Sequence, residues 1–313
     1  MSSYWYRAAA PRVAVEIGRR RINVVAVDRT GTGTVIDAYA SEPLPDGAVT
    51  PALGGTNVPD TGVVADALRR ALDRAGLGST SRAALVVPDS VARVTLLPFE
   101  QMPARAADLD QLVRWQLRKA TPFPLDEAVV GHVVANRAGG QTTLAAVAAR
   151  RDVMAQYEAV AAAAGLHAGI VDLASFNVMN AVIGAGAAPA ADWLLVHLAA
   201  DATTLAILRG EDLMFYRHRP AVDQEPLSAL VHQTAMYHED RLGGDKFARV
   251  WLCGAASTAE HVRSEIAERL GVPAESVDVR PAAAFRQEVS VSSEILDALA
   301  PSVGVLLRER KAA

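Results

Sequence analysis

Side chains that could bind a metal or act as a nucleophile occur in three stretches, but none has the spacing that such chemistry needs. His232 and His238 lie six residues apart on a predicted helix, so they do not share a face, and we expect them on a solvated surface. Cys253 has no second cysteine to pair with, and a free cysteine in an apolar strand is most often a core residue. Pro88-Asp89-Ser90 lacks the glycine-flanked turn of a nucleophilic serine. We therefore predict no catalytic residue and no metal ligand.

A basic turn near the start of the chain is a better candidate for binding an anion. Glu16-Ile17-Gly18-Arg19 combines a carboxylate, a turn glycine and the first of three consecutive arginines. The arginines could attract phosphate, since cationic side chains and turn N–H groups both favour anions. The alternative interpretation is a solvated basic turn without a ligand.

This turn belongs to a pattern of strands that occurs twice. β-branched and aromatic residues fill short apolar runs, and small or acidic residues fill the turns between them. In the second half of the chain, the predicted strands are Trp193–Leu198, Thr203–Leu208 and Leu213–Arg217. In the first half, they are Arg12–Ile17, Ile22–Asp28 and Thr34–Tyr39. One antiparallel meander therefore begins each half, and an internal repeat of this kind is evidence about architecture.

Hydrophobic periodicity and turn residues place the other elements and indicate an α/β protein. The predicted helices are Thr61–Ala75, Ala104–Ala120, Arg151–Ala164, Ser175–Ile183, Leu227–Leu242, Ala259–Leu270 and Pro301–Lys311. The remaining predicted strands are Ala83–Val87, Ala92–Leu97, Ala128–Asn136, Thr142–Ala148, Gly169–Leu173, Val250–Cys253 and Ser276–Val279. Ser41–Asp60 reads as a loop, Pro98 should end its strand, and Gly184–Ala191 is the clearest linker.

Composition argues for an ordinary folded domain protein and against nucleic acid as a partner. Hydrophobic residues make up 51% of the chain and charged residues 21%, with a net charge of −4 and a pI of about 6.0. A nucleic-acid binder would be expected to carry a basic face and a high pI. The single cysteine fits a reducing cytoplasm. No apolar stretch approaches the roughly 20 residues that span a bilayer, so we expect no direct membrane insertion.

The order of motifs resembles the family of the type IV pilus assembly protein PilM, within the actin-like ATPase superfamily and related to FtsA. The resemblance rests on VAVEIGRRRINVVAVD, on TPFPLDE after an amphipathic helix, and on AGLHAGIVDLASF before the linker. It implies an α/β actin-like ATPase fold with two similar domains, each with a mixed sheet flanked by helices, and an inserted FtsA-type subdomain. The expected division is 10–87 with 150–184 for the first domain, about 297–311 packing back on it, 88–149 for the insert, and 192–296 for the second domain.

The same resemblance implies a nucleotide site at the first turn of each meander, where backbone N–H groups would hold phosphates. The family pattern at the first turn is Asp-x-Gly-Ser/Thr, with a Lys a few residues later. This chain has Glu16, Gly18, Arg19 and, in place of the Lys, Asn23. The carboxylate and the glycine are kept, whereas the hydroxyl and the amine are lost.

The second turn departs further from the family pattern. The aspartate is replaced by His197, and a neutral imidazole is a poor Mg²⁺ ligand because Mg²⁺ prefers oxygen. Thr203 and Thr204 remain, and Gly254 keeps one of two glycines expected beside the base. We therefore expect a degenerate nucleotide site, with ATP and Mg²⁺ binding weakened or lost, no cofactor required and negligible ATPase activity.

The resemblance further implies a cytoplasmic scaffold of a type IV pilus machine, peripheral to the inner membrane through a partner. That partner would be a PilN-like membrane protein, whose cytoplasmic N-terminal peptide would lie between the first domain and the 88–149 insert. Phe99 or Phe123 could line this groove, or pack in a core. Other pilus assembly proteins and self-association into a homo-oligomer are further expected contacts.

Two alternatives remain open at this stage. One is a working actin-like ATPase whose nucleotide state switches partner binding, which intact phosphate-loop residues would favour. The other is the cytoplasmic part of a type II secretion protein of the GspL kind, which shares the fold and continues into a transmembrane helix. The basic segment Arg308–Lys311 at the end of this sequence argues against the latter.

Overall fold

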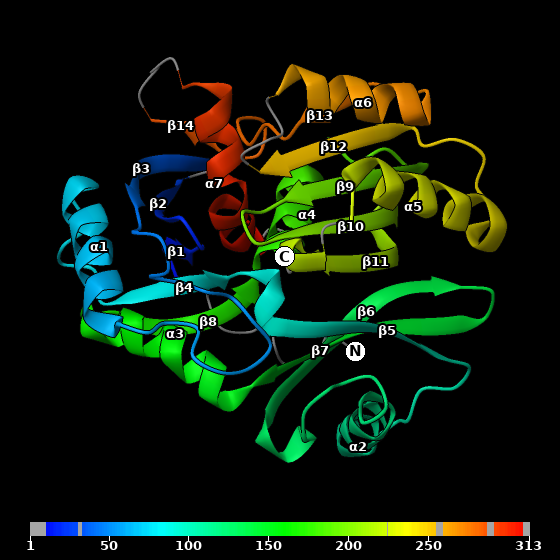
Figure 1. Ribbon diagram of the computed structural model, residues 1–313, viewed down its shortest axis with the longest axis horizontal. Helices are drawn as coiled ribbons and strands as arrows, with labels where there is room; N and C mark the ends of the chain where they lie inside the picture. The colour runs from blue at the N-terminus through cyan, green and yellow to red at the C-terminus, as the bar shows by residue number, and fades with distance from the viewer. Residues whose placement is uncertain (1–10, 31–32, 224, 255–258, 287–290, 309–313) are drawn as a thin grey trace.

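Three β-sheets organise the protein (Figure 1). Its computed structural model describes residues 11–30, 33–223, 225–254, 259–286 and 291–308. The first sheet has six strands in the order β14-β3-β2-β1-β4-β8. They are β1 (Val13–Ile17), β2 (Arg21–Thr30), β3 (Gly33–Pro43), β4 (Arg82–Val87), β8 (His167–Leu173) and β14 (Ala284–Phe285). The strands β1, β2 and β3 form the predicted antiparallel meander, and β4 and β8 extend the sheet in parallel from β1.

The second sheet repeats this plan with five strands in the order β11-β10-β9-β12-β13. They are β9 (Asp192–Leu198), β10 (Ala202–Arg209), β11 (Asp212–Pro220), β12 (Arg249–Gly254) and β13 (Ala274–Ser276). Here β9, β10 and β11 form the meander, and β12 pairs in parallel with β9 as β4 does with β1. The internal repeat predicted from the sequence is therefore confirmed.

A third, three-stranded sheet is formed by the segment between β4 and the next long helix. Its order is β5-β7-β6, with β5 (Ala92–Phe99), β6 (Ala128–Ala138) and β7 (Gln141–Arg150) all antiparallel. Two short 3₁₀ turns flank it, η2 (Asp89–Val91) and η3 (Leu125–Glu127). We refer to β5, β6, β7 and the helix that covers them as the insert.

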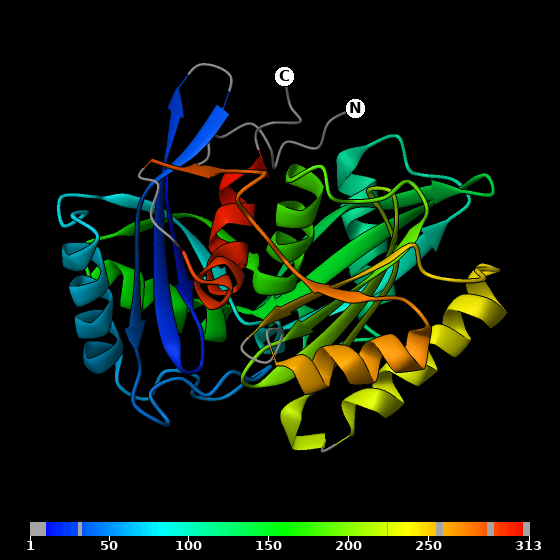
Figure 2. The same cartoon turned by 90° about the horizontal axis from the view of Figure 1, so that it is seen from above.

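Seven helices occur among the described residues, and they cover the sheets in layers. They are α1 (Thr61–Arg74), α2 (Ala106–Leu117), α3 (Arg151–Ala163), α4 (Ala174–Gly184), α5 (Leu227–Leu242), α6 (Glu260–Leu270) and α7 (Ser293–Leu306). In Figure 2, α1 and α3 cover the outer face of the first sheet, α4 and α7 lie between the two large sheets, and α5 and α6 cover the second sheet. The helix α2 packs on the insert sheet. No helix in the described ranges is long and apolar enough to cross a membrane.

The apolar runs of the second meander follow from this layering. In β9, Trp193 and Leu195 face α4 and α7, whereas Leu194 and Val196 face α5 and α6. A strand covered by helices on both faces has no polar face to present, so its sequence is continuously hydrophobic. Turn and cap residues define the ends, as at α1, where the Asp60 carboxylate accepts hydrogen bonds from the N–H groups of Gly62 and Val63.

The last helix differs most from its prediction. We expected a helix from Pro301, because proline suits a first helical turn. Instead α7 begins at Ser293, with the Ser292 hydroxyl accepting from the Ile295 N–H, and Pro301 lies inside it. The helix is buried from Leu296 to Leu306, except at Ala298. Burial against α4 and both sheets therefore outweighs the hydrogen bond that proline cannot make.

Four smaller differences have similar tertiary causes. β5 does not end at Pro98 but continues to Phe99, which is possible because β5 is an edge strand. β3 extends to Pro43, into the predicted loop. The predicted strand Ser276–Val279 lies instead at Ala274–Ser276, although Val277 and Val279 are buried. Finally, Ala284–Phe285 pairs with β3, so the segment assigned to the second domain contributes β14 to the first sheet.

Candidate functional site

Asn23 links the turn between β1 and β2 to the interior of the protein. Gly18 closes the β1–β2 turn by donating its N–H to the Arg21 carbonyl at 3.0 Å. Glu16 and Asn23 are opposite each other in the β1–β2 ladder. The Asn23 amide donates to Glu16 Oε2 at 2.8 Å and to the Ala298 carbonyl of α7 at 3.0 Å. Asn23 is buried, so it joins the carboxylate to α7.

Burial also changes the acidity of Glu16. It raises the pKa of this carboxyl above its ordinary value, and the hydrogen bond from Asn23 and the charges of His197 and Arg21 offset this only in part. By contrast, the side chain of Arg19 is exposed and makes no ion pair within the described ranges. The carboxylate of this turn therefore faces the interior while its positive charge faces solvent.

The second turn converges on an aspartate that lies outside it. His197 at the end of β9 is buried, and its Nδ1 lies 3.5 Å from Asp89 Oδ2, an ion-pair distance. Thr204 is opposite His197 in the β9–β10 ladder, and its hydroxyl donates to the same Asp89 oxygen at 3.0 Å. Thr203 points to the other face of the strand, because successive side chains alternate. Of the two predicted threonines, only Thr204 joins this cluster.

Asp89 is the centre of the cluster. It lies directly after β4, in η2, and its Oδ1 accepts from the Ser175 N–H at 3.1 Å and from the Ser175 hydroxyl at 2.8 Å. Burial alone would raise the pKa of Asp89, but His197, His218 and the Ser175 N–H hold it below its ordinary value. Burial alone would likewise lower the pKa of His197, but Asp89, with Glu16 and Asp297, raises it. Asp89 and His197 therefore form a buried ion pair.

The cluster continues into an arrangement of serine, histidine and acid that could be mistaken for a catalytic site. Ser90 Oγ lies 3.2 Å from His218 Nε2, and His218 Nδ1 lies 3.0 Å from Thr204 Oγ1. However, Ser90 is only 7% exposed, and its hydroxyl already donates to Asp201 Oδ2 at 2.5 Å. The hydroxyl is thus engaged in a buried network, where it stabilises the junction of η2 with β10 and β11.

The retained glycine of the base-side loop is required by packing. Gly254 has φ = +117°, and a Cβ on it would stand 2.0 Å from the Leu198 carbonyl of β9. Its N–H donates to both Asp297 carboxylate oxygens at 2.9 Å. Asp297 belongs to α7 and is buried. The loop residues 255–257, part of the same prediction, lie outside the described residues.

Most of the predicted site residues make contacts with other buried side chains of the protein. Glu16 is held by Asn23, His197 and Thr204 by Asp89, and Gly254 by Asp297. The charges of Glu16 and Asp297 both act on His197 and raise its pKa. No group of three His, Cys, Asp or Glu side chains in the described ranges could hold a metal ion.

The sequence analysis missed two aspartates, Asp89 and Asp297, that contact the predicted site residues. Asp89 follows a buried strand that is parallel to its neighbours, a position where functional side chains often gather, and this was the available signal. The sequence contains no comparable signal for Asp297, because this residue does not follow a buried strand and lies near the expected start of the last helix. His238 was also misplaced, because it is buried with its Nε2 2.8 Å from Asp192 Oδ2 and stacks on Phe247. Cys253 is buried, as predicted.

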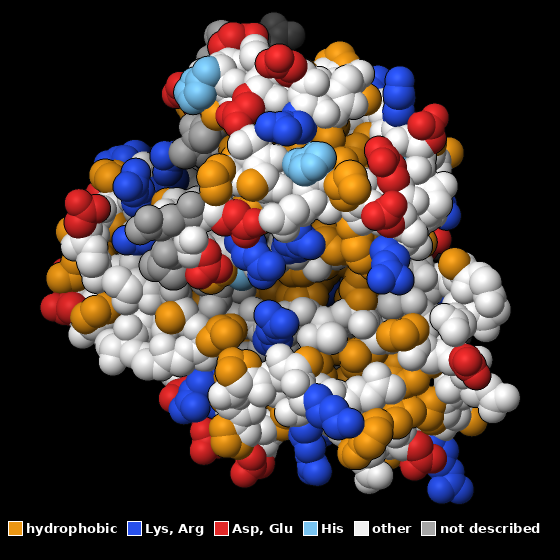
Figure 3. Space-filling model, turned by 45° about the vertical axis from the view of Figure 1, so that its right-hand side comes forward, with side chains coloured by type: hydrophobic (Ala, Val, Ile, Leu, Met, Phe, Trp, Pro, Cys, Tyr) orange, Lys and Arg blue, Asp and Glu red, His pale blue; other side chains and the backbone are white. Residues whose placement is uncertain are grey.

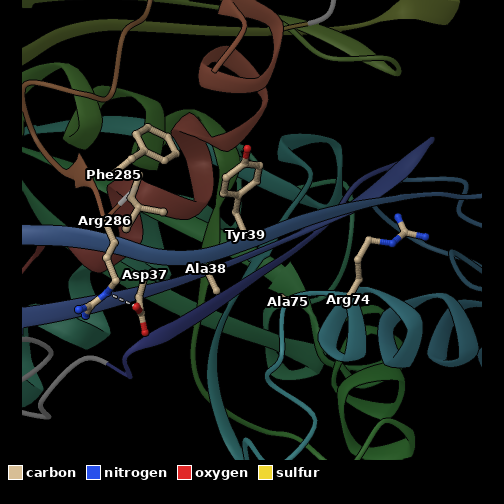
Figure 4. A pocket seen from close by; sticks show the side chains of 8 residues that line it. Asp37, Ala38, Tyr39, Arg74, Ala75, Phe285 and Arg286 are labelled. Atoms are coloured by element: carbon tan, nitrogen blue, oxygen red, sulfur yellow. Dashed lines mark hydrogen bonds and ion pairs between the residues drawn. The ribbon is translucent and has the colours of Figure 1, made fainter. Parts of the chain in front are cut away.

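Two hollows open beside β3 of the first sheet. One, of about 220 Å³, lies at the outer edge of β3, where Figure 4 shows Tyr39 beside Phe285 and Arg286 directed at Asp37. The second, of about 300 Å³, lies between β3 and the start of α7 and includes Arg21, Asn23 and Glu294. Asn23 is the only predicted site residue among those that line these two hollows.

Comparisons with known proteins agree with the order of elements. The family model described as type IV pilus assembly protein PilM matches residues 14–240. A chain of a PilM-PilN type IV pilus biogenesis complex superposes with a TM-score of 0.79 at 20% identity, over 96% of this chain and 97% of that chain. A Bacteroides thetaiotaomicron protein of unknown function with an actin-like ATPase fold gives 0.53 at 8% identity, over 87% and 91%. The cytoplasmic domain of EpsL, an inner-membrane component of the Vibrio cholerae type II secretion system, gives 0.51 at 11% identity, over 96% and 94%. The fold is therefore the actin-like ATPase fold.

Proposed function

Because this chain belongs to the type IV pilus assembly protein PilM family, we propose that it is a cytoplasmic scaffold of a pilus assembly machine. Its specific task would be to bind the cytoplasmic N-terminal peptide of a PilN-like inner-membrane protein, and through it to stay at the membrane. The observation that carries this proposal is the extent of the family match, which runs from β1 through the whole insert into α5. The similar solved chain comes from a complex with PilN.

We place the peptide between the first sheet with its helices and the insert. The segment before α1 spans this junction, since Leu53 packs on the core of the insert and the Asn57 N–H donates to the Gln156 side chain of α3 at 2.7 Å. Arg150, at the junction of β7 and α3, pairs with Glu127 and Asp152. An extended peptide here would gain affinity from backbone hydrogen bonds and specificity from side-chain pockets. Phe99 and Phe123 would not line it, because both are buried beneath α2.

Peptide binding is the direct test of this function. We expect saturable binding of a synthetic peptide copied from the N-terminus of a PilN-like protein, measured by calorimetry, and none of a scrambled peptide. Hydrogen exchange should show protection around Leu53 and Arg150 when the peptide is bound. No binding at protein concentrations suited to micromolar affinity would refute the partner, and protection confined to other segments would refute only the location.

We further propose that this scaffold works without turning over ATP. The contacts that support this are internal: Asn23 on Glu16, Asp89 on His197 and Asp297 on Gly254. Titration with ATP and Mg²⁺ should release no heat, and the melting temperature should not change. A rise of several degrees would require real nucleotide affinity, because a ligand stabilises only the state that it binds.

A rise in melting temperature with ATP and Mg²⁺ would instead support the alternative, an actin-like ATPase whose nucleotide state switches partner binding. The third possibility, a type II secretion protein like EpsL, has the weaker support, since the family match is to PilM. Contacts with other pilus assembly proteins, and self-association, remain part of the proposed scaffold role.

A further inference from the structure

Most of the outer edge of β3 has no partner strand in the described ranges. β14 pairs with β3 in parallel only at Val35 and Ile36, and the Arg286 N–H donates to the Ile36 carbonyl at 3.0 Å. Residues 38–43 of β3 pair with β2 alone among the described strands, and we refer to their outer side as the β3 edge. A strand edge of this kind presents unpaired N–H and C=O groups to whatever lies beside it.

The hydrogen bonds of the meander show which groups face the β3 edge. Successive residues of a strand turn their N–H and C=O groups to opposite sides. The Leu44 N–H donates at 2.8 Å to the carbonyl of Arg20, which directly precedes β2, so the even-numbered residues of this stretch point toward β2. Tyr39 and Ser41 therefore point to the β3 edge, where the Ser41 carbonyl accepts from Arg74 at 3.1 Å. The Tyr39 N–H and carbonyl and the Ser41 N–H make no hydrogen bond within the described residues.

The two hollows described above flank the β3 edge. The hollow of about 220 Å³ includes Ala75 at the end of α1, and the hollow of about 300 Å³ includes Ile295 of α7, which is 36% exposed. Tyr39 and Arg74 line both hollows, so the two meet at this edge. Figure 4 shows the Tyr39 ring on the same side of β3 as Phe285. Because the side chains of a strand alternate between two faces, an added strand would place them in turn beside α1 and beside α7.

The hollow between β3 and α7 carries an excess of basic side chains. Arg21 and Arg74 line it, and Glu294 is the one acidic residue among its described lining residues. Arg21 is exposed and forms no ion pair in the described part of the chain, whereas Arg74 shares the carboxylate of Glu42 with Arg70. On the face shown in Figure 3, by contrast, acidic side chains lie among the Lys and Arg side chains, and the whole chain has a net charge of −4. The basic end of the β3 edge is therefore a local feature that favours an acidic ligand.

We propose that the β3 edge binds an extended, acidic segment of a protein partner, which adds to the first sheet as a further strand. Its backbone would pair with Tyr39 and Ser41, its carboxylates would lie at Arg21 and Arg74, and its apolar side chains would pack against Ile295. An extended backbone is the ligand that matches unpaired N–H and C=O groups at strand spacing, and β14 already pairs with the same side of β3.

A second copy of this chain is a poorer occupant than an acidic segment. Pairing of two β3 edges would bring Arg21 and Arg74 of one copy toward the same arginines of the other, and like charges repel. The β3 edge also differs from the junction proposed for the PilN-like peptide. The insert leaves the first sheet after β4 and returns before β8, at the opposite side of the sheet from β3. The two proposals can therefore fail separately.

The test uses the full chain and a short fluorescent peptide in which glutamate and valine alternate. We expect a dissociation constant of about 10 to 100 µM from fluorescence anisotropy, weakening as salt rises. The same peptide with methylated backbone nitrogens keeps its side chains but cannot donate to the Tyr39 carbonyl, so it should bind at least about tenfold more weakly. A peptide with lysine in place of glutamate should also bind at least about tenfold more weakly. Hydrogen exchange should show protection of Tyr39 and Ser41 on binding.

Two matched pairs of variants locate the site. Ser41→Pro removes the outward N–H without removing a hydrogen bond to β2, so it should weaken binding about tenfold or more, whereas Ser41→Ala keeps the N–H and should leave binding unchanged. Arg21→Glu should weaken binding about tenfold or more. Arg19→Glu, at an exposed position of the same turn that does not line the hollow, should change it little.

Four results would overturn the proposal. They are the absence of binding, equal binding of the methylated peptide, equal effects of Ser41→Pro and Ser41→Ala, and equal effects of Arg21→Glu and Arg19→Glu. The methylated peptide is compared on the unchanged protein, so this comparison holds even if Ser41→Pro does not fold. A dimer in sedimentation that Ser41→Pro abolishes would assign the β3 edge to a second copy and would also overturn the proposal.

Discussion

The two meanders share one backbone plan, but their first turns have different surroundings. In the first half, Gly18 begins an open turn whose arginines are exposed, and Asn23 links Glu16 to α7. In the second half, His197 and Thr204 are buried and bonded to Asp89, which comes from the first half. A repeated fold thus need not repeat its chemistry, because one turn can stay exposed while the other is used to join the halves.

The largest difference between the halves should appear at their glycines. Gly254→Ala places a Cβ 2.0 Å from a backbone carbonyl at φ = +117°, so it should lower the free energy of unfolding by at least about 3 kcal/mol. Gly18→Ala meets its nearest atom, the Arg21 carbonyl, at 3.3 Å and should lower it by about 1 kcal/mol. Urea unfolding of both variants makes the comparison, and equal losses would contradict it.

The loss of stability on substitution should differ nearly as much between the carboxylates Asp89 and Glu16. Asp89→Ala leaves the Ser175 and Thr204 donors and His197 without their buried partner, which should cost about 3 kcal/mol. Glu16→Gln should change stability by less than about 1 kcal/mol, because Gln can still accept from Asn23 and carries no charge to bury. Chemical denaturation measures the stability of both variants. A larger loss of stability in Glu16→Gln than in Asp89→Ala would contradict this comparison of the two turns.

The pH dependence of stability should report the His197–Asp89 pair. The folded-state pKa of His197 is raised, so its contribution is fully present below its unfolded pKa of 6.5 and is lost as pH rises through the folded value. His132 and His218 have lowered pKa values, so their effects fall below 6.5. We expect unfolding free energy to decline above pH 6.5.

A double comparison isolates this effect. Glu16 has a raised pKa and also makes the folded state less stable as pH rises, so the measurement is best made in Glu16→Gln protein. Adding His197→Gln in that background should flatten the decline. If the slope of the unfolding free energy against pH does not change, the His197 imidazole does not titrate in this way.

The smallest effects should come from the exposed arginines of the first turn. Arg19→Ala should change unfolding free energy by no more than about 0.5 kcal/mol, since the side chain has no ion pair within the described ranges. Thr204→Val, in the second turn, should lower it by about 1 to 2 kcal/mol by removing a buried donor to Asp89. Thermal unfolding of both variants measures this difference. A large loss of stability in Arg19→Ala would show that the side chains of the first turn stabilise the fold.

Most elements of this fold were predictable because their signals are local. The runs Trp193–Leu198 and Thr203–Leu208, with small and acidic residues between them, correspond to β9 and β10. The predictions failed where burial overrode a local rule. Pro301 reads as a helix start, yet it lies within α7 because that helix is buried against α4, so closely that a Cβ on Gly304 would stand 1.7 Å from the Asn177 carbonyl.

The candidate site was predictable only in part, for a related reason. The family resemblance led to Glu16, Gly18 and His197, at the turns that the strand pattern marks. Asp89 and Asp297 were not recognised as their partners, because they are distant in the chain and belong to a 3₁₀ turn and to α7. No local pattern encodes which side chain will fill a cleft between two halves.

The sequence by itself determined the repeated meander, the apolar strands and the departures from the phosphate-binding pattern, because these depend on residue type and short spacing. Only the tertiary structure decided that Asn23, Asp89 and Asp297 contact Glu16, His197 and Gly254. Electrostatic and hydrogen-bonding partners are chosen by proximity in space, which exists only once the sheets have packed around α4 and α7.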